Sequence, residues 1–258
     1  SNDKGGTWTQ IKLNLPTVPV DDIQIHPREN DMILATHGRS IWIMDDIAPL
    51  EQLTPAVMES SVHLFDPRQS VMWRTWNNKP LTSDKAFLGQ NPPNGAIVNF
   101  YLKENLADRE SLTLTFQDAA GQVVRTVNCT RPQPTPTPNP AGPGGGGGGG
   151  GFGGFGGGGN QQCTASKGVN RFVWDMRSRP AGPQAPAGGG GGGGGFGGFG
   201  ANAGFRVDPG TFTVKIKLGD KEMSKSLTVI EDPRVMFSPE DRAKKKAALT
   251  KIQPILTQ

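Results

Sequence analysis

The chain has 258 residues, a formal net charge of +4 and 34% hydrophobic residues, together with 37 glycines and 22 prolines. This composition predicts a hydrophobic core smaller than the length suggests, in one or two domains. No apolar run reaches the roughly 18 residues that a transmembrane helix needs. The basic residues are scattered, apart from a cluster at 242–246, which argues against a nucleic-acid-binding surface.

The chain opens with a polar turn that matches the pattern S-x-D-x-G-x-T-W, through Ser1, Asp3, Gly5, Thr7 and Trp8. The Asp3 carboxylate is suited to accept hydrogen bonds from its own turn, and Gly5 suits a positive φ. Trp8 is expected to pack inward as the next strand begins. The pattern resembles the Asp-box, a structural turn between neighbouring strands of certain β-propeller blades; an ordinary hairpin is the alternative.

Short strands follow at intervals of about ten residues. Alternation of polar and apolar residues predicts strands at 9–13 and 22–26, and two further short strands are predicted at 32–36, which is mostly apolar, and at 40–46. Such spacing favours a propeller or a sandwich over a parallel sheet.

Two segments of this region carry a resemblance to a known family. The stretches VDDIQIHP at 20–27 and THGRSIWIMDD at 36–46 resemble the closing blade of sortilin-type Asp-box propellers. These occur in large exported bacterial proteins that are often named glycosyl hydrolases by homology. A weaker resemblance covers 87–96. The resemblance implies that residues 1–46 are the last propeller strands and that the other blades lie upstream in the same chain.

His37 and Arg39 are the candidate binding residues, because a His-Gly-Arg turn exposes an acid/base and a cation together. The favoured interpretation is structural, with Gly38 permitting a tight turn and both side chains bonding to blade backbone. Asp45 and Asp46 are adjacent on a strand and therefore point to opposite faces, which does not suit paired glycosidase carboxylates. No residue is assigned as catalytic, and His26, His37 and His63 lack the spacing of metal ligands.

Residues 47–95 are rich in proline and polar residues, which predicts a connector packed along the propeller. From Ala96 a regular strand pattern begins, with strands predicted at 96–102, 111–116, 122–127, 170–176, 210–217 and 225–230. Residues 96–233 are therefore expected to form an Ig-like β-sandwich of six or seven strands. Its motif order, including the NRFVWD stretch at 170–175, resembles the Ig-like domain of flagellar hook-cap proteins. Trp174 is expected in the core.

Two glycine-rich insertions interrupt this sandwich at about 131–162 and 181–204. Each contains the same unit, a run of eight glycines followed by FGGFG. Ordering so much glycine is entropically unfavourable, so both are expected to be loops that the fold does not need.

The two cysteines bracket the first insertion, and their places beside two strands predict a disulfide between Cys129 and Cys163. A disulfide suits an exported protein. After residue 233 the composition changes again. Ser238 with Pro239 predicts a helix start, so residues 234–258 are expected to begin a helical tail.

The sequence therefore predicts an all-β chain: the final strands of a β-propeller, an Ig-like β-sandwich and a short C-terminal helix. The predicted role is a non-catalytic structural and binding part of a bacterial protein that is periplasmic, extracellular or on the cell surface. Two alternatives stay open: part of a sialidase- or xyloglucanase-like glycoside hydrolase, or a sortilin-like peptide-binding module. The expected partners are upstream blades and a protein or polysaccharide ligand, without nucleic acid, cofactor or metal.

Overall fold

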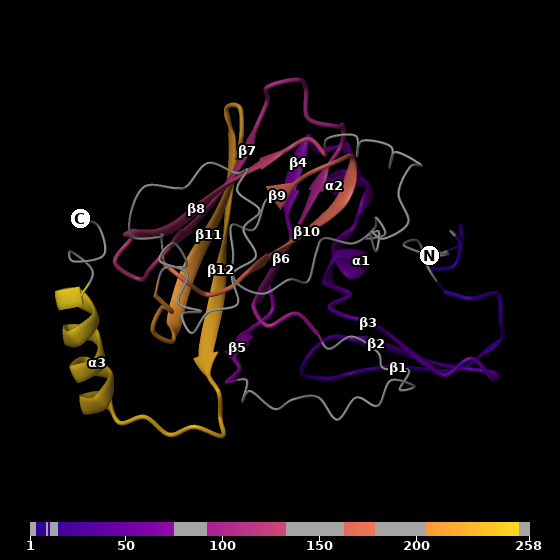
Figure 1. Cartoon of the computed structure of the whole chain (residues 1–258). Coiled ribbons are helices and arrows are strands. Elements are labelled where there is room, and N and C mark those ends of the chain that lie inside the picture. The colour runs from indigo at the N-terminus through magenta and orange to yellow at the C-terminus, as the bar shows by residue number, and fades with distance from the viewer. Residues whose placement is uncertain are drawn as a thin grey trace, which may run out of the picture.

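The computed structural model describes residues 4–8, 10, 15–74, 92–132, 163–178 and 205–252, and this part of the chain is mostly β-strand. The strands form three sheets of three, three and six strands. Figure 1 shows the three-stranded sheet nearest the N-terminus at one end of the other two sheets, which are called the large sheets below. Both glycine-rich units and most of the strand expected at 9–13 lie outside the described residues. No helix in the described ranges is long and apolar enough to span a membrane.

The N-terminal sheet is an antiparallel meander of β1 (Val20–Ile25), β2 (Met32–Thr36) and β3 (Ile41–Met44). All three strands were expected from the sequence. The hairpin between β2 and β3 turns through Gly38, with φ of 71°, and Ser40, with φ of 67°. Gly38 therefore supplies a left-handed turn conformation, as the sequence predicted.

The interpretation of 47–95 as a simple connector is wrong for its first half. After the short helices α1 (Ala48–Gln52) and α2 (Pro55–Glu59), the chain forms β4 (Val62–Leu64) and β5 (Ser70–Met72). β4 pairs antiparallel with β6, and β5 pairs parallel with β12. These strands have three residues each, too few for an alternating pattern to reveal, yet they add one strand to each large sheet.

The three-stranded large sheet has the order β10-β6-β4, with β6 (Ala96–Leu102) at its centre and β10 (Gly168–Trp174) at one edge. The six-stranded sheet has the order β5-β12-β11-β7-β8-β9. Its longer strands are β7 (Leu112–Gln117), β8 (Val123–Thr130), β11 (Gly210–Leu218) and β12 (Lys221–Glu231), and β9 is the two-residue strand Cys163–Thr164.

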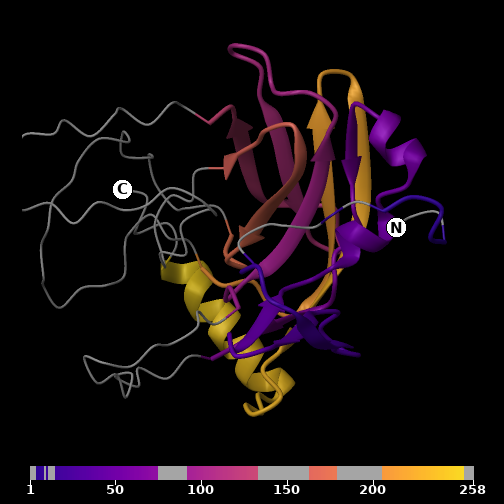
Figure 2. The ribbon, with the colours of Figure 1, turned by 90° about the vertical axis from the view of Figure 1, so that its right-hand side faces the viewer.

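The two large sheets face each other, as Figure 2 shows. Their buried apolar side chains form one core. Alternate residues of β7 and β11 are buried, so each strand directs one face into the core. Trp174 is only 1% exposed, stacks on Phe116 with ring centroids 4.5 Å apart, and meets the edge of Phe212. The expected core position of Trp174 is therefore the observed one.

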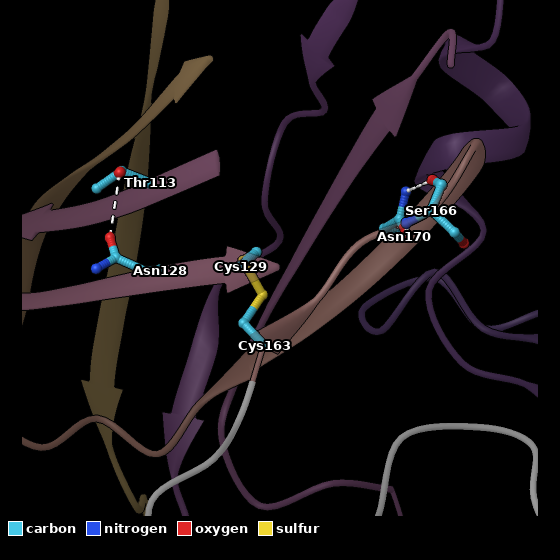
Figure 3. Close-up of a disulfide and its surroundings, with 6 residues drawn as sticks. All are labelled: Thr113, Asn128, Cys129, Cys163, Ser166 and Asn170. Carbon is cyan, nitrogen blue, oxygen red and sulfur yellow. Dashed lines mark hydrogen bonds between the residues drawn. A yellow bond between two sulfur atoms is a disulfide. The ribbon is translucent and has the colours of Figure 1, made fainter. Parts of the chain in front are cut away.

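Cys129 and Cys163 form a disulfide, with Cα atoms 4.3 Å apart (Figure 3). The two residues face each other in the parallel pair of β8 and β9. The bond thus links two strands of one sheet at the point where residues 133–162 leave and rejoin the described chain.

The last element is the helix α3 (Pro239–Ile252). Its start follows the predicted signal, since the Ser238 hydroxyl accepts from the Asp241 N–H at 3.1 Å. Nearly all of its side chains are exposed, and five of them are basic: Arg242, Lys244, Lys245, Lys246 and Lys251.

Candidate functional site

The β1–β3 sheet carries apolar side chains on both faces. Residues paired across antiparallel strands share a face, and alternate residues lie on opposite faces. The register therefore gives one face Ile23, Ile25, Met32, Leu34, Trp42 and Met44, and the other face Ile33, Ala35, Ile41 and Ile43. A sheet at the surface of a protein normally has one polar face, so this pattern is typical of a sheet covered on both sides.

Both faces keep large apolar side chains exposed in the described chain. On one side Ile23 is 57% and Ile25 is 46% exposed; on the other, Ile41 is 64% and Ile43 is 60% exposed. Isolated exposed apolar residues are common, but a group of four large ones on a sheet of three short strands is not. We call the β1–β3 sheet the two-faced sheet. It is the strongest candidate for an interaction surface.

A polar network fastens the two-faced sheet to the sandwich. Asp31, at the start of β2, accepts from Arg68 Nη1 and from the Asp46 N–H, both at 2.8 Å. Asp46, just beyond β3, accepts from Asn99 Nδ2 at 2.7 Å. Arg171 on β10 donates to Asn99 Oδ1 and to the carbonyl oxygens of Asp45 and Asp46.

We call this network the joint, defined by Asp31, Asp45, Asp46, Arg68, Asn99 and Arg171. Asp46 is 2% exposed and Asn99 is 4% exposed, so the bond between them is shielded from water. Asp46 has a φ of 53°, and its Oδ1 also accepts from the Ala48 N–H. This local bond is the kind that lets aspartate occupy the left-handed region.

Carboxylates outnumber guanidinium groups around the joint. Burial raises the pKa of Asp46, although the Ala48 N–H, Arg68 and Arg171 act in the opposite direction. Burial also raises the pKa of Asp45, and the neighbouring Asp31 carboxylate raises it further. A raised carboxyl pKa is a mark of catalytic acids but also of structural ion-pair networks. Here the Asp46 carboxylate is held by Asn99 and Ala48, which favours the structural explanation.

The sequence-predicted binding residues lie away from the joint. His37 and Arg39 sit in the exposed β2–β3 hairpin, where His37 Nδ1 is 3.4 Å from Asp21 Oδ2. The main chain of both residues forms hydrogen bonds, since the His37 N–H donates to the Pro19 carbonyl and the Arg39 carbonyl accepts from Trp42 Nε1. The prediction concerned bonds from the two side chains to backbone, so these bonds do not test it. His37 and Asp21 are both well exposed, so their contact is weak.

The Asp-box prediction is only partly within the described residues. Ser1 and Asp3 lie outside them, while Gly5 has a φ of 95°, which suits the proposed turn. Trp8 is 81% exposed, so the expectation that it packs inward is wrong for this chain.

The histidines considered for metal binding lie on separate elements. His63, on β4, meets the Phe65 ring edge-on at 5.2 Å, and burial together with Lys225 lowers its pKa. His26 Nδ1 accepts from the Glu29 N–H in the β1–β2 turn. No group of three or more His, Cys, Asp or Glu in the described part could hold a metal ion.

No family model, curated protein or solved structure matches this chain. The site therefore has to be judged on its own geometry. Sequence reasoning missed the joint, since its members come from positions 31 to 171 and share no motif. The one signal was Arg171, a charged residue in the NRFVWD stretch directly before Phe172, which packs into the core.

Proposed function

We propose that this chain is a non-catalytic, structural and binding part of an exported Asp-box β-propeller protein. In this proposal the two-faced sheet belongs to the last blade, and the sandwich holds it in place. The observation that carries the proposal is the exposure of apolar residues on both faces of β1–β3. Propeller blades are packed by neighbouring blades on both faces, whereas a sandwich sheet is packed on one.

The resemblance of 20–27 and 36–46 to a closing blade supports the same assignment. A typical blade has four strands, and β1–β3 supplies three of them. Burying four isoleucines of this kind against neighbouring blades would contribute roughly 1.5 to 3 kcal/mol for each side chain. The occupants we propose are therefore further blades of the same protein.

For the sandwich we propose an Ig-like identity, on the basis of strand order. In the conventional lettering of Ig strands, the order β4-β6-β10 corresponds to A-B-E in one sheet. The order β12-β11-β7-β8 corresponds to G-F-C-C′ in the other sheet. β5 then corresponds to the part of strand A that crosses to the second sheet, because it pairs with β12 while β4 pairs with β6. Two features differ from antibody domains. Trp174 lies on the strand equivalent to E, and the disulfide joins strands within one sheet rather than across the sandwich.

The disulfide supports an exported location, because such bonds persist in oxidising compartments. Among the alternatives, a glycoside hydrolase needs two carboxylates facing a common cleft. Asp46 is instead bound within the joint, and no described residue favours catalysis over support. The joint fits the structural role, since it ties the two-faced sheet to both β6 and β10.

The proposal is tested by substituting Ile23→Asp and Ile41→Asp, one on each face, in the natural full-length gene product and in the 258-residue chain. Each change should lower the melting temperature of the full-length protein, because a charge would be buried between blades. The same changes in the 258-residue chain should leave its melting temperature nearly unchanged.

Val123→Asp is the matched control, since Val123 is a 56% exposed strand residue of the sandwich and should tolerate a charge in both proteins. Equal tolerance of the two isoleucine substitutions in both proteins would overturn the proposal. So would a full-length product in which both residues remain exposed to solvent by hydrogen exchange or chemical labelling.

A further inference from the structure

The helix α3 leaves almost all of its surface uncovered. Among its described side chains only Arg242 and Leu249 are half-buried, and all others are exposed. Figure 1 shows the helix beside the sandwich, at the end of the segment that follows β12. Arg242 binds Glu231 of β12 at 3.2 Å, and this ion pair ties the helix to the sandwich. A surface helix normally buries an apolar stripe against the core, so α3 has an unusually large surface available for a partner.

The exposed surface of α3 is strongly basic. Its five cations face only two carboxylates of the same helix, Glu240 and Asp241, which leaves a net charge of +3 on 14 residues. The four lysines of the helix form no ion pair within the described ranges. Arg242 and Lys246 are four residues apart, so two like charges lie next to each other and oppose helix formation. The charge of α3 is therefore not explained by contacts that support the fold.

The cations surround the helix instead of forming one stripe. At 3.6 residues per turn, Lys246 lies on the same side as Arg242, whereas Lys244 and Lys251 lie on the opposite side. Between them the helix carries mainly alanine, and its two large apolar residues do not extend into an apolar face. A partner of α3 is therefore recognised by charge on several sides and not by an apolar surface.

We propose that α3 is a docking element for an anionic polysaccharide. A flexible polyanion can follow the helix surface and contact cations on more than one side of it. Each lysine that neutralises an anionic group also releases bound counterions, and this release favours binding to any highly charged polymer. A helix of this length is only marginally stable without packing, so contact with a polyanion should also stabilise α3 itself.

The chemistry of α3 favours this class over other acidic partners. A lipid surface requires an apolar helix face, and a helix-binding protein groove requires apolar anchors at helical spacing. Single-stranded nucleic acid requires aromatic side chains for base stacking, and α3 has none. The disulfide indicates an oxidising compartment, which favours a polysaccharide over nucleic acid. The inference shares the exported location with the proposed function but does not depend on the propeller assignment.

The test is binding of the 258-residue chain to polygalacturonate, measured by calorimetry at several sodium chloride concentrations. Saturable binding is expected at low salt, and the logarithm of the affinity should fall linearly with the logarithm of the salt concentration. Neutral dextran should not bind. Double-stranded DNA and vesicles with anionic lipids are titrated in the same way. No binding to polygalacturonate, or tighter binding to DNA or to the vesicles, would overturn the proposal.

The double variant Lys244→Gln with Lys246→Gln removes two exposed charges from α3. It should weaken binding by about tenfold or more and make the salt dependence shallower, because each lysine near an anionic surface adds to the affinity. Lys244→Arg with Lys246→Arg keeps both charges and should keep the affinity. The melting temperature should be unchanged in both variants, since these side chains are exposed. A loss of affinity in the arginine variant as large as in the glutamine variant would contradict recognition by charge.

Lys217→Gln with Lys221→Gln is the matched control. It removes the same number of charges from exposed positions of β11 and β12, so the net charge of the chain falls equally. Its affinity should stay within about twofold of the unaltered chain, because distant exposed charges are screened by salt. Hydrogen exchange should show slower exchange of the amides of α3 when polygalacturonate is bound. Equal weakening in the two glutamine variants, or unchanged exchange in α3, would overturn the proposal.

Discussion

The bond between Asn99 and Asp46 gives the sharpest test of the joint. Asn99→Leu keeps a side chain of similar volume but removes the Nδ2 donor that lies 2.7 Å from Asp46 Oδ2, together with the Oδ1 acceptor of Arg171 Nε. Asp46 is 2% exposed, so water cannot readily replace the lost donor. A buried charge-assisted hydrogen bond contributes about 1.5 to 3 kcal/mol. The free energy of unfolding should fall by this amount at pH 7.5.

The loss should become smaller as the pH falls. Burial already raises the folded-state pKa of Asp46, so the folded chain binds a proton more tightly than the unfolded chain. The stability that this proton gives is present below the unfolded pKa, near 4, and is lost as the pH rises through the raised folded pKa. Without Asn99 the ionised form is less stable still, so the folded pKa rises further and the variant gains more from acidification.

Urea unfolding followed by tryptophan fluorescence at several pH values between 7.5 and 4.5 measures both effects. Asn128→Leu serves as the control, because Asn128 is exposed on β8 and its partner is the Thr113 hydroxyl. That control should change stability by no more than about 0.5 kcal/mol at any pH. A deficit in Asn99→Leu that stays constant with pH would refute the reasoning, since it would not arise from the ionised carboxylate.

Three further substitutions test other parts of the fold. Gly95→Ala should destabilise by about 1 to 3 kcal/mol in thermal unfolding, because its Cβ would lie 2.6 Å from the Trp174 carbonyl oxygen; unchanged stability would show that β6 and β10 can separate there. Replacing Cys129 and Cys163 together by serine should cost about 3 to 4 kcal/mol in the chain-entropy model, and a smaller loss on urea unfolding would point to strain or residual structure. Asp45→Asn should stabilise by up to about 1 kcal/mol at pH 7.5 and by less near pH 4, since its raised pKa means that the ionised form opposes folding; destabilisation at both pH values would contradict this.

The longer strands could be predicted from the sequence because their side chains either alternate between core and solvent, as in β11, or form a mostly apolar run that is buried almost throughout, as in β6. The pattern at 96–102 and 210–217 predicted β6 and β11 almost to the residue. β4 and β5 could not be predicted, because three residues show no period and their pairing with β6 and β12 depends on contacts far along the chain. The polar composition of 47–95 therefore suggested a connector where two sandwich strands lie.

Features that depend on local hydrogen bonds and backbone conformation could be predicted, in the candidate site and elsewhere. Gly38 in the β2–β3 hairpin and Ser238 at the start of α3 act within their own turns, so the sequence identifies them. The joint depends instead on Asn99 and Arg171, which have no sequence relation to Asp46. Strand alternation indicated that Asp45 and Asp46 would diverge, but both lie beyond the end of β3, where tertiary contacts decide their environment.

The polar character of the joint is itself informative about the proposed role. A buried ionic network adds little net stability compared with apolar residues of the same volume, but its hydrogen bonds are satisfied in only one geometry. An apolar contact between sheet and sandwich would stabilise many relative orientations about equally. If neighbouring blades are to pack on both faces of β1–β3, the sheet must be presented at one angle. Asn99 and Arg171 achieve this by bonding Asp46 at both its carboxylate and its carbonyl, so a support that orients the sheet explains the joint better than a need for added stability.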